Sequence, residues 1–175
     1  FGAANKMINF LLAFYNGLGS AILGFNAQNY GKYRFDRVKK GLKQTWALML
    51  VFFALCFAAA MLLSIGGTYQ HIFMSEDKIS DASIRFGNTY IYVDFILYFI
   101  LGFLVVTRSA VQGIFKPGYV LGAGIAELGA RILICYFLPA IVNGAPITAS
   151  ASTASFAALC FGDPGAWLAA SVVLL

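Results

Sequence analysis

Charged residues are scarce in this sequence. They make up 11% of the 175 residues, whereas hydrophobic residues make up 61% and the mean hydropathy is +0.81. A typical soluble domain is about 25% charged and about half apolar, so a chain of this length could not hide its apolar surface from water. The composition excludes a soluble globular domain and predicts a protein whose main partner is the lipid bilayer.

Histidine and cysteine are also few, and they form no cluster. The single histidine is His71, and the three cysteines, Cys56, Cys135 and Cys160, show no CxxC spacing. We therefore predict no metal site. No Ser/His/Asp set, HExxH motif or glycine-rich phosphate loop occurs, so we expect no enzyme and no cofactor. The net charge of +5 does not indicate a nucleic-acid partner, because most basic residues lie in short loops between apolar stretches.

Five apolar segments approach the length that crosses a bilayer, which is about 20 residues for a hydrocarbon core of about 30 Å. They cover residues 4–25, 45–65, 90–106, 119–142 and 164–175, and the last is cut short by the end of the sequence. We predict an all-α integral membrane protein with about five transmembrane helices, and we expect a fragment of a longer chain. Residues 155–161 fit either a short interfacial helix or part of the last span.

The loops between these spans differ in their basic residues. Loop 27–44 holds six lysines or arginines, and loop 107–118 holds two with no acidic residue. Loop 68–89 holds two, together with three acidic residues, and loop 143–163 holds none. Lysine and arginine are retained on the cytoplasmic side of membranes. We therefore predict that loops 27–44 and 107–118 face the cytoplasm and that the protein spans the cell membrane.

Three charged residues lie inside predicted spans, where a charge costs at least about 2.5–3.5 kcal/mol on insertion scales. Glu127 and Arg131 are four residues apart, in the order that favours an i,i+4 pair. They form either a self-neutralising structural pair or a site where Glu127 exchanges a proton or contacts a cationic substrate. Asp94 has no basic residue within one helical turn. It is either a boundary carboxylate in contact with external water or a group that couples transport to H⁺ or Na⁺.

Several short motifs follow one another along the chain. A Gln-Asn-Tyr-Gly turn precedes a basic stretch, the third predicted span ends in a Gln-Gly turn, and the fourth contains the Glu127/Arg131 pair. The loop residues that carry these motifs are Gln28, Asn29, Gly31, Arg37, Gln112 and Gly113. Together the motifs resemble the MATE (multidrug and toxic compound extrusion) family over nearly the whole chain. Lys32 departs from the pattern, since family members usually have alanine there.

The resemblance implies a transporter of twelve helices in two six-helix lobes, with this chain as helices eight to twelve in the C-terminal lobe. Such an antiporter exports small organic, often cationic, compounds in exchange for H⁺ or Na⁺, and the missing lobe of the same polypeptide would complete it. The aspartate that many members carry in their first helix lies outside this chain, so Asp94 is the candidate ion site. Tyr92 and Tyr98, in the same span, are candidates for cation–π contact with the substrate.

Two other functions fit the same pattern. A lipid-linked oligosaccharide flippase of the wider superfamily shares the architecture, but we expect its cavity to be more cationic in order to hold pyrophosphate. A membrane scaffold subunit without transport activity needs no charges inside the bilayer. The mixed charges of the predicted spans therefore favour the export of organic compounds.

Overall fold

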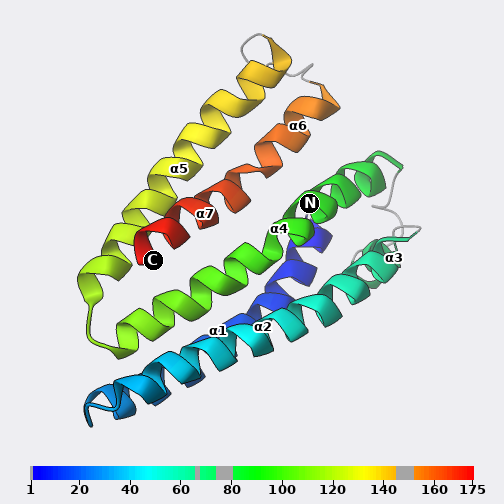
Figure 1. The fold of residues 1–175 in the computed structure, drawn as a ribbon. Helices are drawn as coiled ribbons and strands as arrows, with labels where there is room; N and C mark the ends of the chain where they lie inside the picture. The colour runs from blue at the N-terminus through cyan, green and yellow to red at the C-terminus, as the bar shows by residue number, and fades with distance from the viewer. Residues whose placement is uncertain (1, 66–67, 74–80, 145–151) are drawn as a thin grey trace.

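The computed structural model describes residues 2–65, 68–73, 81–144 and 152–175, and its regular elements there are all α-helices (Figure 1). The helices are α1 (Gly2–Tyr30), α2 (Phe35–Ser64), α3 (Thr68–Phe73), α4 (Asp81–Gly113), α5 (Pro117–Asn143), α6 (Thr153–Cys160) and α7 (Gly162–Leu174). The all-α prediction is therefore confirmed.

Four helical stretches are long and apolar enough to cross a membrane. They are Phe35–Ser64, Ile84–Gly113, Pro117–Asn143 and Thr153–Leu174. The first predicted span lies within α1, whose 29 residues give a length of about 43 Å at the usual helical rise. The chain has an integral membrane helical fold.

The helices extend beyond the apolar segments that predicted them. α4 begins at Asp81 rather than near Tyr90, so Arg85 belongs to a helix and not to a loop. Glu76, Asp77 and Lys78, which the sequence placed in the same loop, lie outside the described residues. Hydropathy falls at the first polar residues, but the backbone hydrogen bonds of a helix continue through them. The length of an apolar segment therefore underestimates the length of a membrane helix.

The last span consists of two helices joined end to end. Ser152 caps α6 by accepting a hydrogen bond from the Ser155 backbone at 3.2 Å. Phe161 alone separates α6 from α7. Pro164 has no N–H, so the carbonyl of Cys160 loses its helical partner, and this accounts for the interruption. Residues 155–161 lie within the stretch Thr153–Leu174, which is long and apolar enough to cross a membrane.

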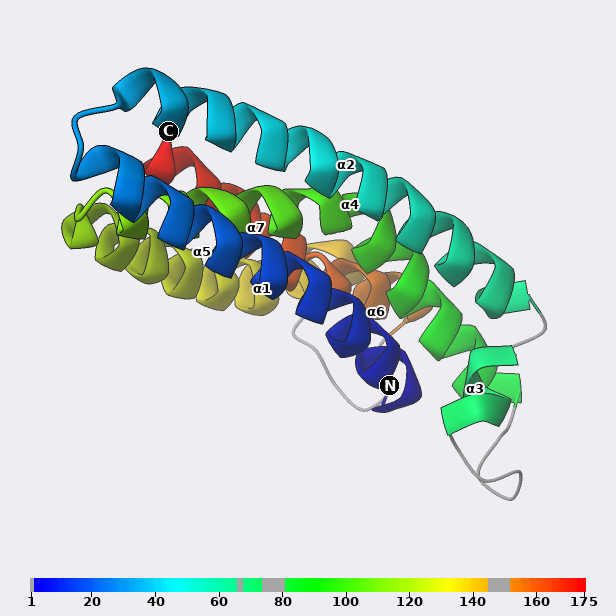
Figure 2. The same ribbon diagram turned by 90° about the horizontal axis from the view of Figure 1, so that it is seen from below.

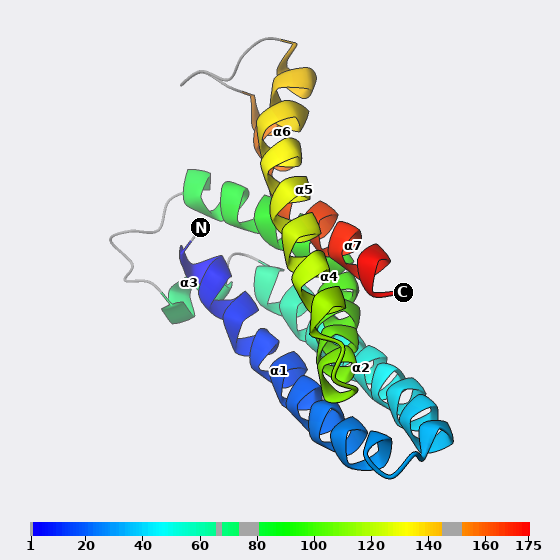
Figure 3. The ribbon, with the colours of Figure 1, turned by 90° about the vertical axis from the view of Figure 1, so that its left-hand side faces the viewer.

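α4 lies at the centre of the arrangement. Figures 1 and 3 show α1 and α2 on one side of α4 and α5 with α7 on the other, and α4 contacts α1, α2 and α7. The side chains of Ile91 and Phe95 in α4 are completely buried. Large apolar side chains of α5 are exposed instead, among them Ile125 and Leu133. An apolar surface of this kind is expected on a helix that faces lipid.

α1 and α4 approach each other closely because glycines lie at their contact. A Cβ atom at Gly19 would lie 2.6 Å from Ser109 Oγ, and one at Gly113 would lie 2.6 Å from the Leu23 carbonyl oxygen. At Gly113 the neighbour is backbone and leaves no room for a side chain, whereas at Gly19 the Ser109 side chain would have to move aside. Small residues let helix backbones approach in lipid, where no hydrophobic effect drives helices together.

The two loops with the basic residues lie at the same end of the helix arrangement, as Figures 1 and 2 show. We call this the basic end. In the turn after α1, Tyr33 lies in the left-handed region at a φ of 56°, and the backbone of Arg34 donates to the carbonyl of Asn29. The turn after α4 is similar, with Phe115 at a φ of 58°. These tight turns reverse the chain direction and make the adjoining helices antiparallel.

Candidate functional site

Asp94 lies in the middle of α4, and its side chain is 1% exposed. The hydroxyl of Tyr90, one turn earlier, forms a hydrogen bond with the carboxylate. Within the described part of the chain, the second oxygen, Oδ1, has no hydrogen-bond partner. A buried carboxylate without a cation is costly when it is ionised, so this site is suited to binding a proton or a cation.

An aromatic cluster lies beside Asp94 and joins three helices. Tyr98 is its central member, with ring centroids 5.2 Å from Phe95, 5.3 Å from Tyr15 of α1 and 6.0 Å from Trp167 of α7. The hydroxyl of Tyr15 is buried and has no hydrogen-bond partner among the described residues. The faces of aromatic rings attract cations, but Tyr98 is only 1% exposed here, because the rings of Phe95 and Tyr15 are stacked on it.

Tyr92 lies apart from this cluster. Its side chain is 42% exposed, and its hydroxyl lies 3.4 Å from Ser64 Oγ in α2. Two residues along a helix differ by about 200° in direction, so Tyr92 and Asp94 point to nearly opposite sides of α4. Of the two tyrosines predicted to line a cavity, the structure places only Tyr98 beside Asp94.

Glu127 and Arg131 form the predicted pair, and they belong to a longer chain of charges. Glu127 accepts hydrogen bonds from Arg131 at 3.3 Å and from Arg108 of α4 at 2.7 Å. Arg131 Nε also lies 3.0 Å from Asp163 Oδ1 in α7, an ion-pair contact without hydrogen-bond geometry. This ion chain of two arginines and two carboxylates is formally neutral and connects α4, α5 and α7. The same Asp163 lies within electrostatic range of Asp94.

The sequence placed two members of the ion chain in loops. Arg108 was assigned to loop 107–118 and Asp163 to loop 143–163, but the structure places both in helices. Asp163 precedes Pro164, and an acidic residue before a proline is a common signal for the first turn of a helix. This signal was available in the sequence. No comparable signal indicated that Arg108 would reach Glu127, because that contact depends on which helices are neighbours.

The six loop-motif residues do not gather at one site. Gln28, Gly31, Arg37 and Gln112 are exposed, Asn29 is buried, and Gly113 lies against α1. Asn29 donates to the Phe25 carbonyl at 2.8 Å, within its own helix. Asn26, just before the motif, was not among the predicted site residues; it is 1% exposed and donates to the Ala110 carbonyl in α4 at 3.2 Å. This hydrogen bond joins α1 to α4.

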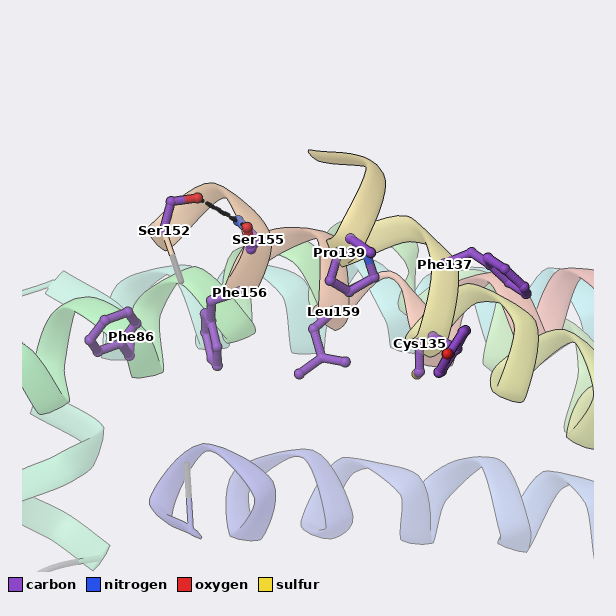
Figure 4. A pocket seen from close by; sticks show the side chains of 10 residues that line it. Phe86, Cys135, Phe137, Pro139, Ser152, Ser155, Phe156 and Leu159 are labelled. Carbon is purple, nitrogen blue, oxygen red and sulfur yellow. Dashed lines mark hydrogen bonds between the residues drawn. The ribbon is translucent and has the colours of Figure 1, made fainter. Parts of the chain in front are cut away.

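A separate cavity of about 650 Å³ opens between α4, α5 and α6. Its lining is mostly apolar and includes Phe86, Pro139, Ser155, Phe156 and Leu159. Figure 4 shows Phe86, Phe156 and Leu159 directed into one space. Pro139 lies inside α5, so the carbonyl of Cys135, four residues earlier and also in the lining, lacks a helical partner. The volume is in the range of small-molecule sites.

Among the described residues, no three histidine, cysteine, aspartate or glutamate side chains gather as metal ligands. In comparisons with known proteins, no curated protein and no solved structure matches this chain. Residues 1–137 of the 175 match the family model MatE. The matched region contains Asp94, Glu127 and Arg131. The chain belongs to the MatE family of membrane transporters.

Proposed function

We propose that the chain is the main part of one lobe of an antiporter that exports small organic cations in exchange for H⁺ or Na⁺. The observation that carries this proposal is the state of Asp94, which is buried in the middle of a central helix with one oxygen unpartnered. Binding of H⁺ or Na⁺ neutralises this carboxylate and removes the cost of its charge. A cationic substrate neutralises it equally well, so the ion and the substrate compete for the site.

The aromatic cluster supports an organic cation as the substrate. Tyr98 is stacked on Phe95 and packed against Trp167, so the rings next to Asp94 are held in place. Aromatic rings beside a carboxylate favour flat cations, because cation–π attraction adds to the ion pair. Tyr98 is 1% exposed, so we infer that the substrate reaches its ring only after the cluster opens. Release to the other side of the membrane follows when the opposing lobe moves relative to this one.

The ion chain argues against the flippase alternative. Arg108 and Arg131 are each paired with a carboxylate, so the described helices offer no surplus of positive charge around Glu127. A pyrophosphate group needs unpaired cations. The cell membrane and a cytoplasmic position of loops 27–44 and 107–118 complete the proposal, and they rest on the distribution of lysine and arginine.

The test is ethidium export by the full-length parent protein in an efflux-deficient host, under imposed pH or sodium gradients. Asp94→Asn removes the charge with little change in shape, and we expect ion-driven export to fall by an order of magnitude or more. Asp81→Asn is the matched control, since Asp81 is an exposed carboxylate on the same helix. Full export by the Asp94→Asn protein would remove Asp94 from the mechanism. Absence of export under both gradients would favour the flippase, to be assayed with lipid-linked sugars.

A further inference from the structure

At the basic end, α1 and α2 enclose a small groove that the transport site does not include. Its volume is about 270 Å³. Four of the lining residues, Arg37, Lys40, Gly41 and Gln44, come from α2, and Phe25 comes from α1. The α2 residues have the spacing i, i+3, i+4 and i+7, which places them on one face of the helix. The groove therefore presents two cations and an amide over an aromatic floor.

Gly41 makes room for this floor. A Cβ atom at Gly41 would lie 2.5 Å from the ring of Phe25, so the ring rests against bare backbone. Every other residue type would displace the ring. The shape of the groove thus depends on one glycine in α2 and one aromatic side chain in α1.

The groove continues along the two helices, away from the basic end. A second hollow of about 290 Å³ shares Phe25, Gly41 and Gln44 with the first. Its remaining lining consists of Ala21, Ile22, Thr45 and Leu48. The hydroxyl of Thr45 donates to the Gly41 carbonyl at 2.9 Å, so the polar atom of Thr45 is already used by the backbone. Polarity therefore falls along the groove, from cationic at the end of the helices to apolar further along them.

The cations at the mouth of the groove are available to an anion. None of the ion pairs formed by the described residues includes Arg37 or Lys40. Asp36 precedes them in α2 but does not line either part of the groove. The N-terminus of α2 lies at this end as well, and the positive end of its dipole adds to the attraction for negative charge.

We propose that this α1–α2 groove binds an anionic phospholipid, with the phosphate between Arg37 and Lys40 and an acyl chain along Ile22 and Leu48. Such a lipid has the same order of chemistry as the groove, with negative charge at one end and hydrocarbon beyond it. Basic pockets between membrane helices at the membrane surface are suited to anionic headgroups. A free phosphate ion would leave the apolar part empty, and a neutral lipid would leave both cations unpaired.

The experiment measures lipid retention by the full-length protein with native mass spectrometry. Phosphatidylglycerol and phosphatidylcholine with identical acyl chains are titrated separately, and glycerol 3-phosphate serves as the soluble phosphate. We expect phosphatidylglycerol to bind most tightly. Arg37→Gln with Lys40→Gln should weaken its binding about thirtyfold, at the usual contribution of each basic residue near a membrane surface.

The matched control is Lys39→Gln with Lys43→Gln, which removes the same charge from the same turns of α2. Lys39 and Lys43 are exposed and line neither part of the groove. This double variant should change phosphatidylglycerol binding less than about threefold, since only a general surface potential is lost. Equal weakening by both double variants would overturn the proposal, as would equal binding of phosphatidylcholine or full competition by glycerol 3-phosphate.

A second pair of variants tests the groove without altering charge. Gly41→Leu fills the place of the Phe25 ring, and Ala21→Trp obstructs the apolar part from α1. Each should reduce phosphatidylglycerol binding, while the melting temperature in phosphatidylcholine nanodiscs reports whether the variant folds. Ala21→Trp leaves the tight contact at Gly41 unchanged, so it keeps the test decisive if Gly41→Leu does not fold. Undiminished binding in a folded Ala21→Trp protein would contradict the proposed path of the acyl chain.

Discussion

Replacement of Glu127 should destabilise the protein far more when Arg108 is present than when it is absent. Glu127→Gln keeps the shape of the side chain but leaves Arg108 and Arg131 facing each other without the carboxylate between them. The 2.7 Å contact with Arg108 is a charge-assisted hydrogen bond between two helices. Bonds of this kind contribute about 1.5–3 kcal/mol to the free energy of unfolding.

The exposure of the side chains sets the size of the effect. Glu127 is 20% exposed and Arg108 30%, so the pair lies between a fully buried pair and a surface pair. We expect a coupling free energy of about 1–2 kcal/mol between Arg108 and Glu127. The Arg131 contact is longer, at 3.3 Å, and joins residues of one helix. Such i,i+4 pairs contribute about 0.2–0.5 kcal/mol, so its coupling should be several times smaller.

The assay is a pair of double-mutant cycles on the full-length protein, with the free energy of unfolding measured by reversible denaturation in mixed micelles. One cycle combines Glu127→Gln with Arg108→Gln, and the other combines it with Arg131→Gln. Lys116→Gln is the control, because Lys116 directly precedes α5 and forms no ion pair among the described residues, and it should be additive with Glu127→Gln. Additivity of Arg108→Gln with Glu127→Gln would show that the interhelical pair does not exist. Equal coupling in both cycles would refute the expectation that the shorter Arg108 contact is the stronger of the two.

Two further predictions concern packing and orientation. Gly113→Ala should lower the free energy of unfolding by about 1–3 kcal/mol, because its Cβ would clash with the Leu23 carbonyl. The control Gly118→Ala should be neutral or slightly stabilising, since no atom lies within 4 Å of its Cβ position. Similar melting temperatures for the two variants would contradict the close approach of α1 and α4. In a background without natural cysteines, Lys39→Cys should react with an impermeant maleimide only in inverted vesicles and Ser152→Cys only in intact cells. The reverse labelling would overturn the predicted cytoplasmic side.

The spans could be predicted from the sequence because long apolar runs have few alternatives to the bilayer. The ends of the helices could not, since Arg85 and Arg108 continue helices in which hydropathy has already fallen. Glycine spacing was informative only in part. Gly19 lies at the α1–α4 contact, but Gly17 has no neighbour within 4 Å of its Cβ position. Spacing along one helix identifies small residues, and only the positions of the other helices decide which of them touch.

The candidate site was predictable to a similar extent. Asp94, Glu127 and Arg131 stand out because charge is rare in apolar segments, and the i,i+4 relation within α5 follows from the sequence alone. Partners from other helices do not follow from it. Asp163 contacts Arg131 from α7, and Tyr15 contacts Tyr98 from α1. These partners are far apart in the sequence, and no local sequence pattern predicts such contacts.

The interruption at Phe161 gives the last span a built-in joint between two functional regions. α6 lines the 650 Å³ cavity through Phe156 and Leu159, and α7 begins with the carboxylate that contacts Arg131. In a continuous helix, a force on α6 would produce a small bend spread over the whole length. With the hydrogen bond from residue 164 missing, bending is concentrated at one residue, less than one turn from Asp163. We therefore expect a molecule that widens the cavity to tilt α6 about Phe161 and so to change the position of Asp163 relative to Arg131.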